Sequence, residues 1–306
     1  MMTAQLSFAS RVINGILAIN PLFSLAKFQA RRMMINRAEA IGVPWIQNAA
    51  ALQARDWTAE FAQVYHPHCT YPAYYLKPFH AYSEGNLGWH PATEAESAAA
   101  AVHAKIWPEA GAQGDTWLRG SYHDVLIAQL PAAPPTILDL GCSVGMSTFA
   151  LQTAFPGAQI TGLDLSPYFL AVAQLRSQNL PPSSPAPHWL HAAAETTGLP
   201  SSSFDLVSAC LMFHELPQTA AIAILQEARR LLRPGGHLAI MDMNPQSATF
   251  AQMPPFILTL LKSTEPYLDE YFALDMPSAI AKAGFSRPTT IANSPRHRTI
   301  VAQAIS

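Results

Sequence analysis

The chain has 306 residues, of which 50% are hydrophobic and only 12% are charged, and its formal net charge is −2. This length can bury a core for one large domain or two smaller ones, and the low charge favours a globular protein with an apolar surface, pocket or membrane-facing side. A net charge so close to zero gives no reason to expect nucleic acid as a partner.

The first apolar stretch, Val12 to Ile19, is interrupted by Asn14 and Gly15 and is much shorter than the roughly 20 residues that span a bilayer. A cleaved signal peptide is not expected, because no basic region precedes the stretch and no small-residue cleavage site follows it. The three cysteines lack metal-ligand spacing and suit a reducing compartment. We therefore expect a cytoplasmic protein.

A helix is expected from Asn20, which can cap it, through Pro21 at its first position to Ile41, before Gly42. Its apolar face would hold Leu22, Leu25, Phe28 and Met33, and its basic face Lys27, Arg31 and Arg37. Residues 1–37 contain five basic residues and no acidic one. Two interpretations stay open: residues 1–41 contact a membrane surface peripherally, or the helix covers the rest of the protein.

Residues 61–90 are rich in aromatic side chains and hold four of the 11 histidines. A zinc site built from His66, His68 and Cys69 would lack a fourth ligand. We therefore expect no metal site.

The composition changes at the linker Pro131–Pro135, where prolines prevent a helix from continuing. Before it, residues 1–130 predict helices and then an aromatic-rich loop region. After it, residues 131–306 alternate apolar strands with helices, which is typical of a parallel α/β sheet. Strands are expected at Ile137–Leu140, Ile160–Leu165, His188–His191, Phe204–Cys210, His237–Met243, Phe285–Ala292 and Arg298–Ala304, the last two as an antiparallel pair. Helices are expected at Met146–Phe155, Tyr168–Leu180, Thr219–Leu232 and Met276–Ala283, with a loop at 181–187 and a turn at Arg233–Gly236.

The segment from Asp139 to Gly145 joins the first of these strands to a helix and reads Asp-Leu-Gly-Cys-Ser-Val-Gly. Glycines at such a turn let the backbone approach a ligand, and a helix N-terminus attracts anionic or polar groups. A phosphate-binding loop would need Gly-Lys-Ser/Thr, and a dinucleotide loop would need glycine in place of Ser143. The pattern D-x-G-x-x-x-G instead resembles the first motif of class I S-adenosylmethionine (SAM)-dependent methyltransferases.

Further motifs follow in the order that this family shows. Asp164 ends the second strand, where a carboxylate can accept both hydroxyls of a ribose. The rest of the series is Glu195, Leu199-Pro200, Phe204–Val207 and Glu227–Gly236. Over residues 135–243 the chain resembles the SAM methyltransferases of ubiquinone and menaquinone biosynthesis.

The resemblance implies a cofactor site for SAM. It assigns Asp139, Gly141, Cys142, Ser143 and Gly145 to the methionine moiety, Asp164 to the ribose, Leu165 to the adenine, and Leu211 to the neighbourhood of the sulfonium. The family often has Asp or Asn where Ala193 stands. Because this chain departs there, adenine recognition would depend on the backbone of Ala194, on apolar packing and on Glu195.

His214 and Glu215 come directly after the fourth strand, at the sheet edge where ligands bind in open α/β folds. Histidine can take a proton near neutral pH, so these two residues are the candidates for a catalytic base or a substrate contact. The alternative is that His214 packs structurally and Glu215 forms a salt bridge or caps the next helix.

The N-terminal extension usually covers the mouth of the site in this superfamily. His80, Tyr82 and Trp89 are therefore candidates for an apolar acceptor wall, against the alternative of a loop packed by its own aromatics. Tyr267 and Tyr271 are four residues apart and can share a helix face in the second region expected to cover the acceptor.

The resemblance implies a Rossmann-like seven-stranded α/β sheet, over 131–306, beneath a helical N-terminal cap, over 1–130. We expect a SAM-dependent methyltransferase that acts on oxygen or carbon of a small lipophilic acceptor, such as a quinone, phenol or isoprenoid-type molecule, and not on nucleic acid. The competing hypothesis is a SAM-binding regulatory module without turnover.

Overall fold

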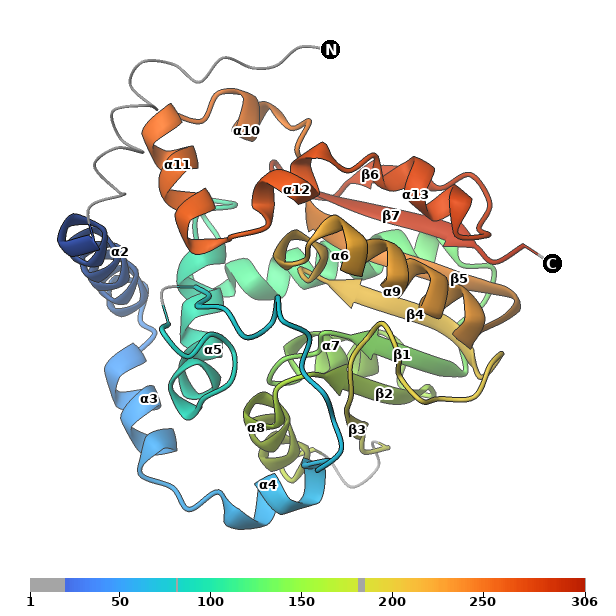
Figure 1. The fold of residues 1–306 in the computed structure, drawn as a ribbon, viewed down its shortest axis with the longest axis horizontal. Helices are drawn as coiled ribbons and strands as arrows, with labels where there is room; N and C mark the ends of the chain where they lie inside the picture. Colours follow the sequence, from blue (N-terminus) through green and yellow to red (C-terminus); the bar gives the residue numbers. More distant parts are fainter. Residues whose placement is uncertain (1–19, 81, 181–184, 306) are drawn as a thin grey trace.

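The computed structural model describes residues 20–80, 82–180 and 185–305 (Figure 1). The apolar stretch Val12–Ile19 and residues 181–184 of the expected loop lie outside this range. The centre of the fold is a seven-stranded sheet with strand order β3-β2-β1-β4-β5-β7-β6. The strands are β1 (Thr136–Leu140), β2 (Gln159–Asp164), β3 (His188–His191), β4 (Phe204–Cys210), β5 (Leu232–Met243), β6 (Thr289–Ala292) and β7 (His297–Gln303).

The sheet has a parallel part and an antiparallel edge. Strands β1 to β5 run parallel to one another, with Ile137 of β1 opposite Ile160 of β2 and Leu206 of β4. Strand β7 is antiparallel to both β5 and β6, as expected for the last two strands. The predicted Rossmann-like α/β fold is confirmed.

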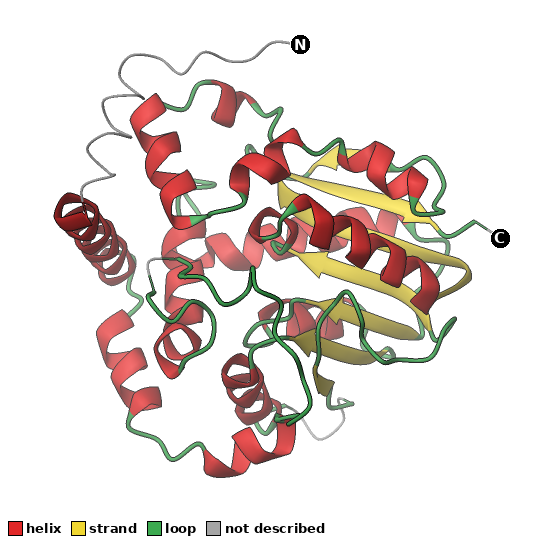
Figure 2. Cartoon of the chain, viewed as in Figure 1, coloured by secondary structure: helices red, strands yellow, loops and turns green. Residues whose placement is uncertain are grey.

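Helices cover both faces of the sheet (Figure 2). They are α2 (Asn20–Ala40), α3 (Trp45–Gln53), α4 (Thr58–Val64), α5 (Trp89–His103), α6 (Gly114–Gln129), α7 (Met146–Ala154), α8 (Pro167–Ser177), α9 (Gln218–Leu231), α10 (Ala248–Ala251), α11 (Pro255–Thr264), α12 (Leu268–Ala273) and α13 (Met276–Lys282), with short 3₁₀ turns η1 (Gly111–Gln113) and η2 (Phe213–Glu215).

Alternation along the strands divides the core into two layers. Leu138 of β1 and Val207 of β4 pack with α9, α12 and α13 on one face. Their neighbours Ile137 and Leu206 pack with α6 and α7 on the other face. This arrangement follows from the period of two in a strand, and side chains buried on both faces are typical of a parallel sheet covered by helices.

Helix α6 belongs to residues 1–130 in sequence but packs directly against the sheet. Leu118 and Leu126 are fully buried there, and the Tyr122 hydroxyl lies 2.9 Å from Ser208 Oγ of β4. The core of the sheet therefore extends across the linker at 131–135. A domain boundary at this linker stays a prediction.

Two residues of the predicted basic face of α2, Arg31 and Arg37, contact α5. Arg31 forms a 2.5 Å ion pair with Glu94 of α5, and Arg37 donates to the Ala101 carbonyl. By contrast, Phe28 is 62% exposed and Met33 is 52% exposed. The side chains of Leu22, Leu25 and Lys27 lie outside the described part. No described helix is long and apolar enough to cross a membrane.

Two strand predictions were wrong at their starts. Arg233–Gly236, expected as a turn, lies within β5 as an irregular part of the strand, where Gly235 has a left-handed φ of 81° and its N–H donates to the Ala304 carbonyl. The register of β4 and β5 shifts at this place. Strand β6 begins at Thr289 and not at Phe285, since the intervening Pro288 has no N–H to pair. Helix α8 also ends earlier than expected, at Ser177.

Candidate active site

The loop between β1 and α7 needs both of its glycines. Gly141 has a φ of 66°, and a Cβ there would lie 2.6 Å from Met212 Sδ. Gly145 caps α7 with a φ of 85°, and a Cβ there would lie 2.8 Å from Phe149 and from Trp189. Left-handed φ values and missing space both select glycine, so the two positions fix the path of the loop.

Asp139 lies fully buried beneath this loop. Its Oδ2 accepts hydrogen bonds from Ser147 (2.8 Å) and Thr148 (2.7 Å), which fix the first turn of α7. Its Oδ1 is buried and has no hydrogen-bond partner among the described residues. Burial raises the pKa of this carboxyl to about 6. The loop therefore contains an acceptor that a polar or cationic ligand group can pair.

Asp164, at the end of β2, is the second buried carboxylate of this edge. It accepts from the backbone N–H groups of Ser143 and Ser166, both at 2.8 Å. The Tyr75 hydroxyl also donates to it, at 3.3 Å. Burial raises its pKa to about 6, although these hydrogen bonds favour the ionised form.

The aromatic-rich segment reaches across the ends of β2 and β3. Tyr74 donates to Glu195 at 2.6 Å, and Glu195 Oε2 has no further partner among the described residues. The Tyr71 hydroxyl lies 3.1 Å from His191 Nε2. Asn86 accepts at its carbonyl from Ser166. Residues 71–80 and 82–86, which we call the covering segment, therefore lie over this edge of the sheet. The contacts are made mainly by tyrosines that were not among the predicted site residues.

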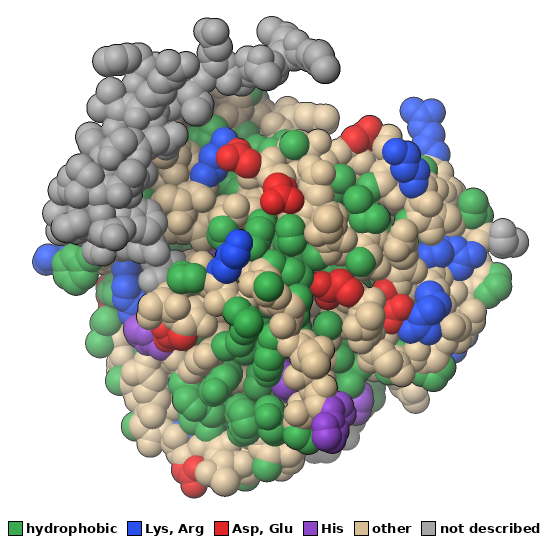
Figure 3. Space-filling model, in the orientation of Figure 1, with side chains coloured by type: hydrophobic (Ala, Val, Ile, Leu, Met, Phe, Trp, Pro, Cys, Tyr) green, Lys and Arg blue, Asp and Glu red, His purple; other side chains and the backbone are tan. Residues whose placement is uncertain are grey.

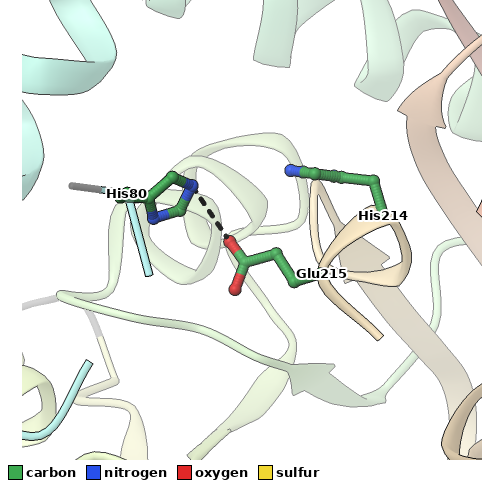
Figure 4. Close-up of side chains that lie close together, drawn as sticks. All are labelled: His80, His214 and Glu215. Carbon is green, nitrogen blue, oxygen red and sulfur yellow. Dashed lines mark ion pairs between the residues drawn. The ribbon is translucent and has the colours of Figure 1, made fainter. Parts of the chain in front are cut away.

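A cluster of four ionisable side chains lies beyond the end of β4, and Figure 4 shows three of them, His80, His214 and Glu215. His214, in η2, is 5% exposed; its Nδ1 lies 2.7 Å from Asp242 Oδ1, and its backbone N–H donates to Asp242 Oδ2. His80 Nε2 lies 2.8 Å from Glu265 Oε1 and 3.7 Å from Glu215 Oε1. We call His80, His214, Glu215 and Glu265 the His–Glu cluster.

Burial and mutual charge shift the pKa values in this cluster. Burial opposes a charge on His214, but Asp242 beside it raises the pKa of His214 to about 10. Burial raises the pKa of Glu215 to about 7, although His80 and His214 act in the opposite direction. Shifted values of this kind are typical of functional sites.

Strained backbone is concentrated at the same edge of the sheet. Among the described residues, positive φ at non-glycine positions occurs at His80, Ser143, Ser202 and Leu211. Three of these four lie in the candidate site: His80 belongs to the His–Glu cluster, Ser143 lies in the glycine loop, and Leu211 follows β4. Such strain persists where the surrounding structure enforces it, which is common at ligand sites.

The residues expected to form the acceptor wall do not come together. Tyr82 donates to Glu94, at the interface with α2. Trp89 stacks on Trp57 at 5.1 Å and packs against α8 in a separate aromatic group. Of these three candidates, only His80 lies in the cluster.

The two tyrosines near α12 are buried. Tyr271 donates to the Met243 carbonyl and packs edge-on against His214, with ring centroids 6.5 Å apart. Tyr267 packs against Tyr74 and lies beneath the Lys77 ammonium. Tyr271 therefore supports His214, and only Tyr267 meets the covering segment.

The remaining cofactor candidates lie along the same edge. Leu165 and Ala194 are buried after β2 and β3, and Cys142 is buried in the glycine loop. Ala193 pairs with Thr196 in a short bridge and presents no polar side chain.

Asp242, Glu265 and Tyr75 were missed by the sequence analysis. Asp242 had a signal, since a carboxylate near the end of an apolar strand marks the ligand edge of a parallel sheet. Glu265 and Tyr75 had no such signal, because only the tertiary fold brings them to this edge.

Comparisons with known proteins agree with this fold and site. Residues 138–240 match the family described as "Methyltransferase domain". An uncharacterised methyltransferase of Synechocystis sp. is 30% identical over 166 residues, which cover 54% of this chain and 74% of that protein. The chain belongs to the class I SAM-dependent methyltransferases, and the expected cofactor of the family, SAM, is confirmed with it.

Other relatives are more partial. A ubiquinone biosynthesis O-methyltransferase of Xanthomonas oryzae is 32% identical over 128 residues, or 42% of this chain. The chain spans about half (51%) of the length of that curated relative. A SAM-dependent methyltransferase structure from Aquifex aeolicus has a TM-score of 0.50 and 18% identity, covering 66% of this chain and 98% of its own. This last likeness shows the fold.

Proposed function

We propose that the chain transfers a methyl group from SAM to an oxygen atom of a small lipophilic acceptor. An acidic carbon is the alternative target that the same groups would allow. The observation that carries the proposal is the His214–Asp242 pair. Figure 4 shows His214 close to Glu215 and His80, and Met212, two residues before His214, lies against Gly141 of the glycine loop.

The residues at the ends of β1 and β2 fit SAM. Asp164 would hold the ribose hydroxyls, since each carboxylate oxygen can accept more than one hydrogen bond. The unpaired Oδ1 of Asp139 is suited to the ammonium of the methionine moiety, and the free N–H groups of α7 to its carboxylate. Leu165 and Ala194 supply apolar contacts for adenine, with Glu195 Oε2 as an unpaired acceptor nearby.

When bound, SAM supplies a methyl group on a positively charged sulfur, which is already activated for transfer. The chain then needs chiefly to orient the acceptor, and orientation alone can contribute about 7–11 kcal/mol to catalysis. The His–Glu cluster would place an acceptor hydroxyl, with a glutamate accepting its hydrogen bond and the imidazoles of His80 and His214 facing the oxygen.

The covering segment would exclude water from this centre. Three of its tyrosine hydroxyls contact residues at the sheet edge: Tyr71 contacts His191, Tyr74 contacts Glu195, and Tyr75 contacts Asp164. Exclusion of water strengthens electrostatic interactions within a site and suppresses hydrolysis. An acceptor would enter past this segment.

A lipophilic acceptor is supported by the surface of the same segment. Figure 3 shows hydrophobic side chains gathered near the middle of one face, where Figure 1 places the aromatic-rich segment. Near this segment in sequence, Leu76 is 59% exposed and Tyr65 is 45% exposed. The Xanthomonas relative is named for an O-methylation in ubiquinone biosynthesis, which also favours an apolar phenolic acceptor.

Peripheral membrane contact through residues 1–41 remains a proposal. The exposed Phe28 and Met33 support it, whereas Arg31 and Arg37 are engaged with α5 and are poorly placed to meet anionic lipid.

The test is to incubate the protein with methyl-labelled SAM and either a cell lipid extract or the matching polar extract. We expect label in a lipid product, and the Asp164→Ala variant should lose it. Label only in polar metabolites or protein would disprove the lipophilic acceptor. Binding of SAM without any labelled product would favour the regulatory module instead.

A further inference from the structure

Three side chains of the His–Glu cluster offer donor atoms to one point. One atom each from His80, His214 and Glu215 lie within 4.8 Å of one another, and the residues come from the covering segment and from η2 (Figure 4). Two imidazoles and a carboxylate are a common ligand set for divalent transition metals. Ligands around a tetrahedral zinc lie roughly 3.3 Å apart, given zinc–nitrogen distances near 2.0 Å, so a small contraction of the cluster would complete such a geometry.

His214 is already oriented as a metal ligand. Its Nδ1 is engaged by Asp242 at 2.7 Å, which leaves Nε2 as the free nitrogen facing the cluster. A histidine that ligates a metal usually donates its other N–H to a carboxylate or carbonyl, and this contact fixes the ring and its tautomer. The Asp242 contact supplies this arrangement in a nearly fully buried setting.

Glu265 provides an independent sign that a ligand belongs in the cluster. Its side chain is 6% exposed, and its Oε1 lies 2.8 Å from His80 Nε2. Its Oε2 is buried and has no hydrogen-bond partner among the described residues. A buried carboxylate oxygen without a partner is costly unless a cation or donor pairs it. Glu265 therefore holds His80 in the cluster and adds negative charge beside the point where the three donor atoms meet.

We infer that His80, His214 and Glu215 form a binding site for one divalent transition-metal ion of the zinc type, with a fourth position left open and with Glu265 beside His80. Two imidazoles favour such an ion over Mg²⁺ and Ca²⁺, which prefer oxygen ligands. Two carboxylates match the charge of the ion, so that it can be held without leaving an unpaired charge. The His80 side chain is 41% exposed, which gives the ion a route from solvent.

The position of the site indicates what the ion would do. Resting on the proposed function, the ion would bind the oxygen of the acceptor and so select acceptors with a hydroxyl that can lose its proton. The cluster follows Met212, which lies against Gly141 of the cofactor loop, so the bound oxygen would face the cofactor side.

The test uses the full-length chain, stripped with a chelator and dialysed, and titrated calorimetrically with ZnCl₂ or MgCl₂. We expect one Zn²⁺ per chain and an affinity at least 100-fold weaker for Mg²⁺. His80→Ala and Glu265→Gln should each weaken Zn²⁺ binding by tenfold or more, while thermal unfolding of the metal-free variants shows that they are folded.

The matched control is the double variant His66→Ala/His68→Ala, which removes two histidines of the same segment. Both side chains are exposed, with ring centroids 5.8 Å apart, and they lie near Cys69. This variant should bind Zn²⁺ like the parent. Zinc binding that is absent from the parent, or that is lost only in the control, would overturn the metal site.

The metal site and the proposed function fail separately. Stoichiometric zinc binding at the cluster without any methyl transfer would contradict the function and keep the site. Methyl transfer by a chain that binds no zinc would contradict the site and keep the function.

Discussion

The two sides of the candidate site are built in different ways. The cofactor side consists of short contiguous stretches at the ends of neighbouring parallel strands, the glycine loop 139–145 and Asp164. The acceptor side joins His80, His214 and Glu265, which are far apart in the chain and meet only in the folded protein. Family motifs therefore describe the first side well, whereas the second side can vary without altering any motif.

The largest expected effect comes from removing Asp164, the main carboxylate of the cofactor side. Asp164→Ala deletes a buried acceptor that would hold two ribose hydroxyls, and each hydrogen bond to a charged group contributes about 1.5–3 kcal/mol. We expect SAM affinity, measured by calorimetry, to fall by about 100-fold or more. Asp124→Ala, at an exposed position on α6, is the control and should bind normally. Equal affinity in the two variants would overturn the placement of the cofactor.

Asp242→Asn tests the acceptor side alone. The amide keeps the shape of Asp242 but removes the charge that orients His214 and raises its pKa. Loss of such a supporting carboxylate typically reduces activity by about 10–100-fold. We expect that loss in the turnover of labelled SAM, with SAM affinity unchanged within about twofold. A matching loss of SAM affinity would show that the two sides are not separable.

The fold was largely predictable because its strands carry their own signals. Short, largely apolar runs separated by helices and turns located the five parallel strands within a few residues, except where β5 extends back through Gly235. Helices α5 and α6 lie where an aromatic-rich loop region was predicted. Helices α10 and α11 were also missed, since apolar stretches next to prolines do not distinguish a helix from a loop. Their placement depends on packing against the rest of the chain.

The site was predictable only in part, for the same reason. Asp164 and the glycines follow from local geometry, whereas Tyr75, Asp242 and Glu265 reach the site through contacts across 89, 28 and 185 residues of sequence. Metal ligands that are close in sequence, such as His66 and His68, can be recognised from their spacing. The cluster of His80, His214 and Glu215 has no such spacing, because the fold brings the covering segment to η2.

The pH dependence of cofactor binding sharpens the description of the cofactor side. Burial raises the pKa of Asp164 to about 6, and the ribose hydroxyls would donate to its ionised form. SAM affinity should therefore be nearly constant from pH 8 to 7 and fall by up to about tenfold between pH 6 and 5, as the carboxylate takes up a proton. Calorimetry across this range measures the effect. Asp164→Asn should flatten this part of the profile; an unchanged slope would assign it to another group.

The smallest effect concerns the contact between Tyr75 and Asp164. The Tyr75 hydroxyl donates to Asp164 at 3.3 Å and so occupies part of the acceptor that the ribose would use. If the ribose displaces it, Tyr75→Phe removes a competitor and should strengthen SAM binding by about two- to tenfold, the value of one ordinary hydrogen bond. Tyr71→Phe, whose hydroxyl meets His191 and not Asp164, is the matched control. Weaker SAM binding in Tyr75→Phe alone would instead show that the covering segment forms part of the cofactor site. Tyr75 would then belong to the cofactor side.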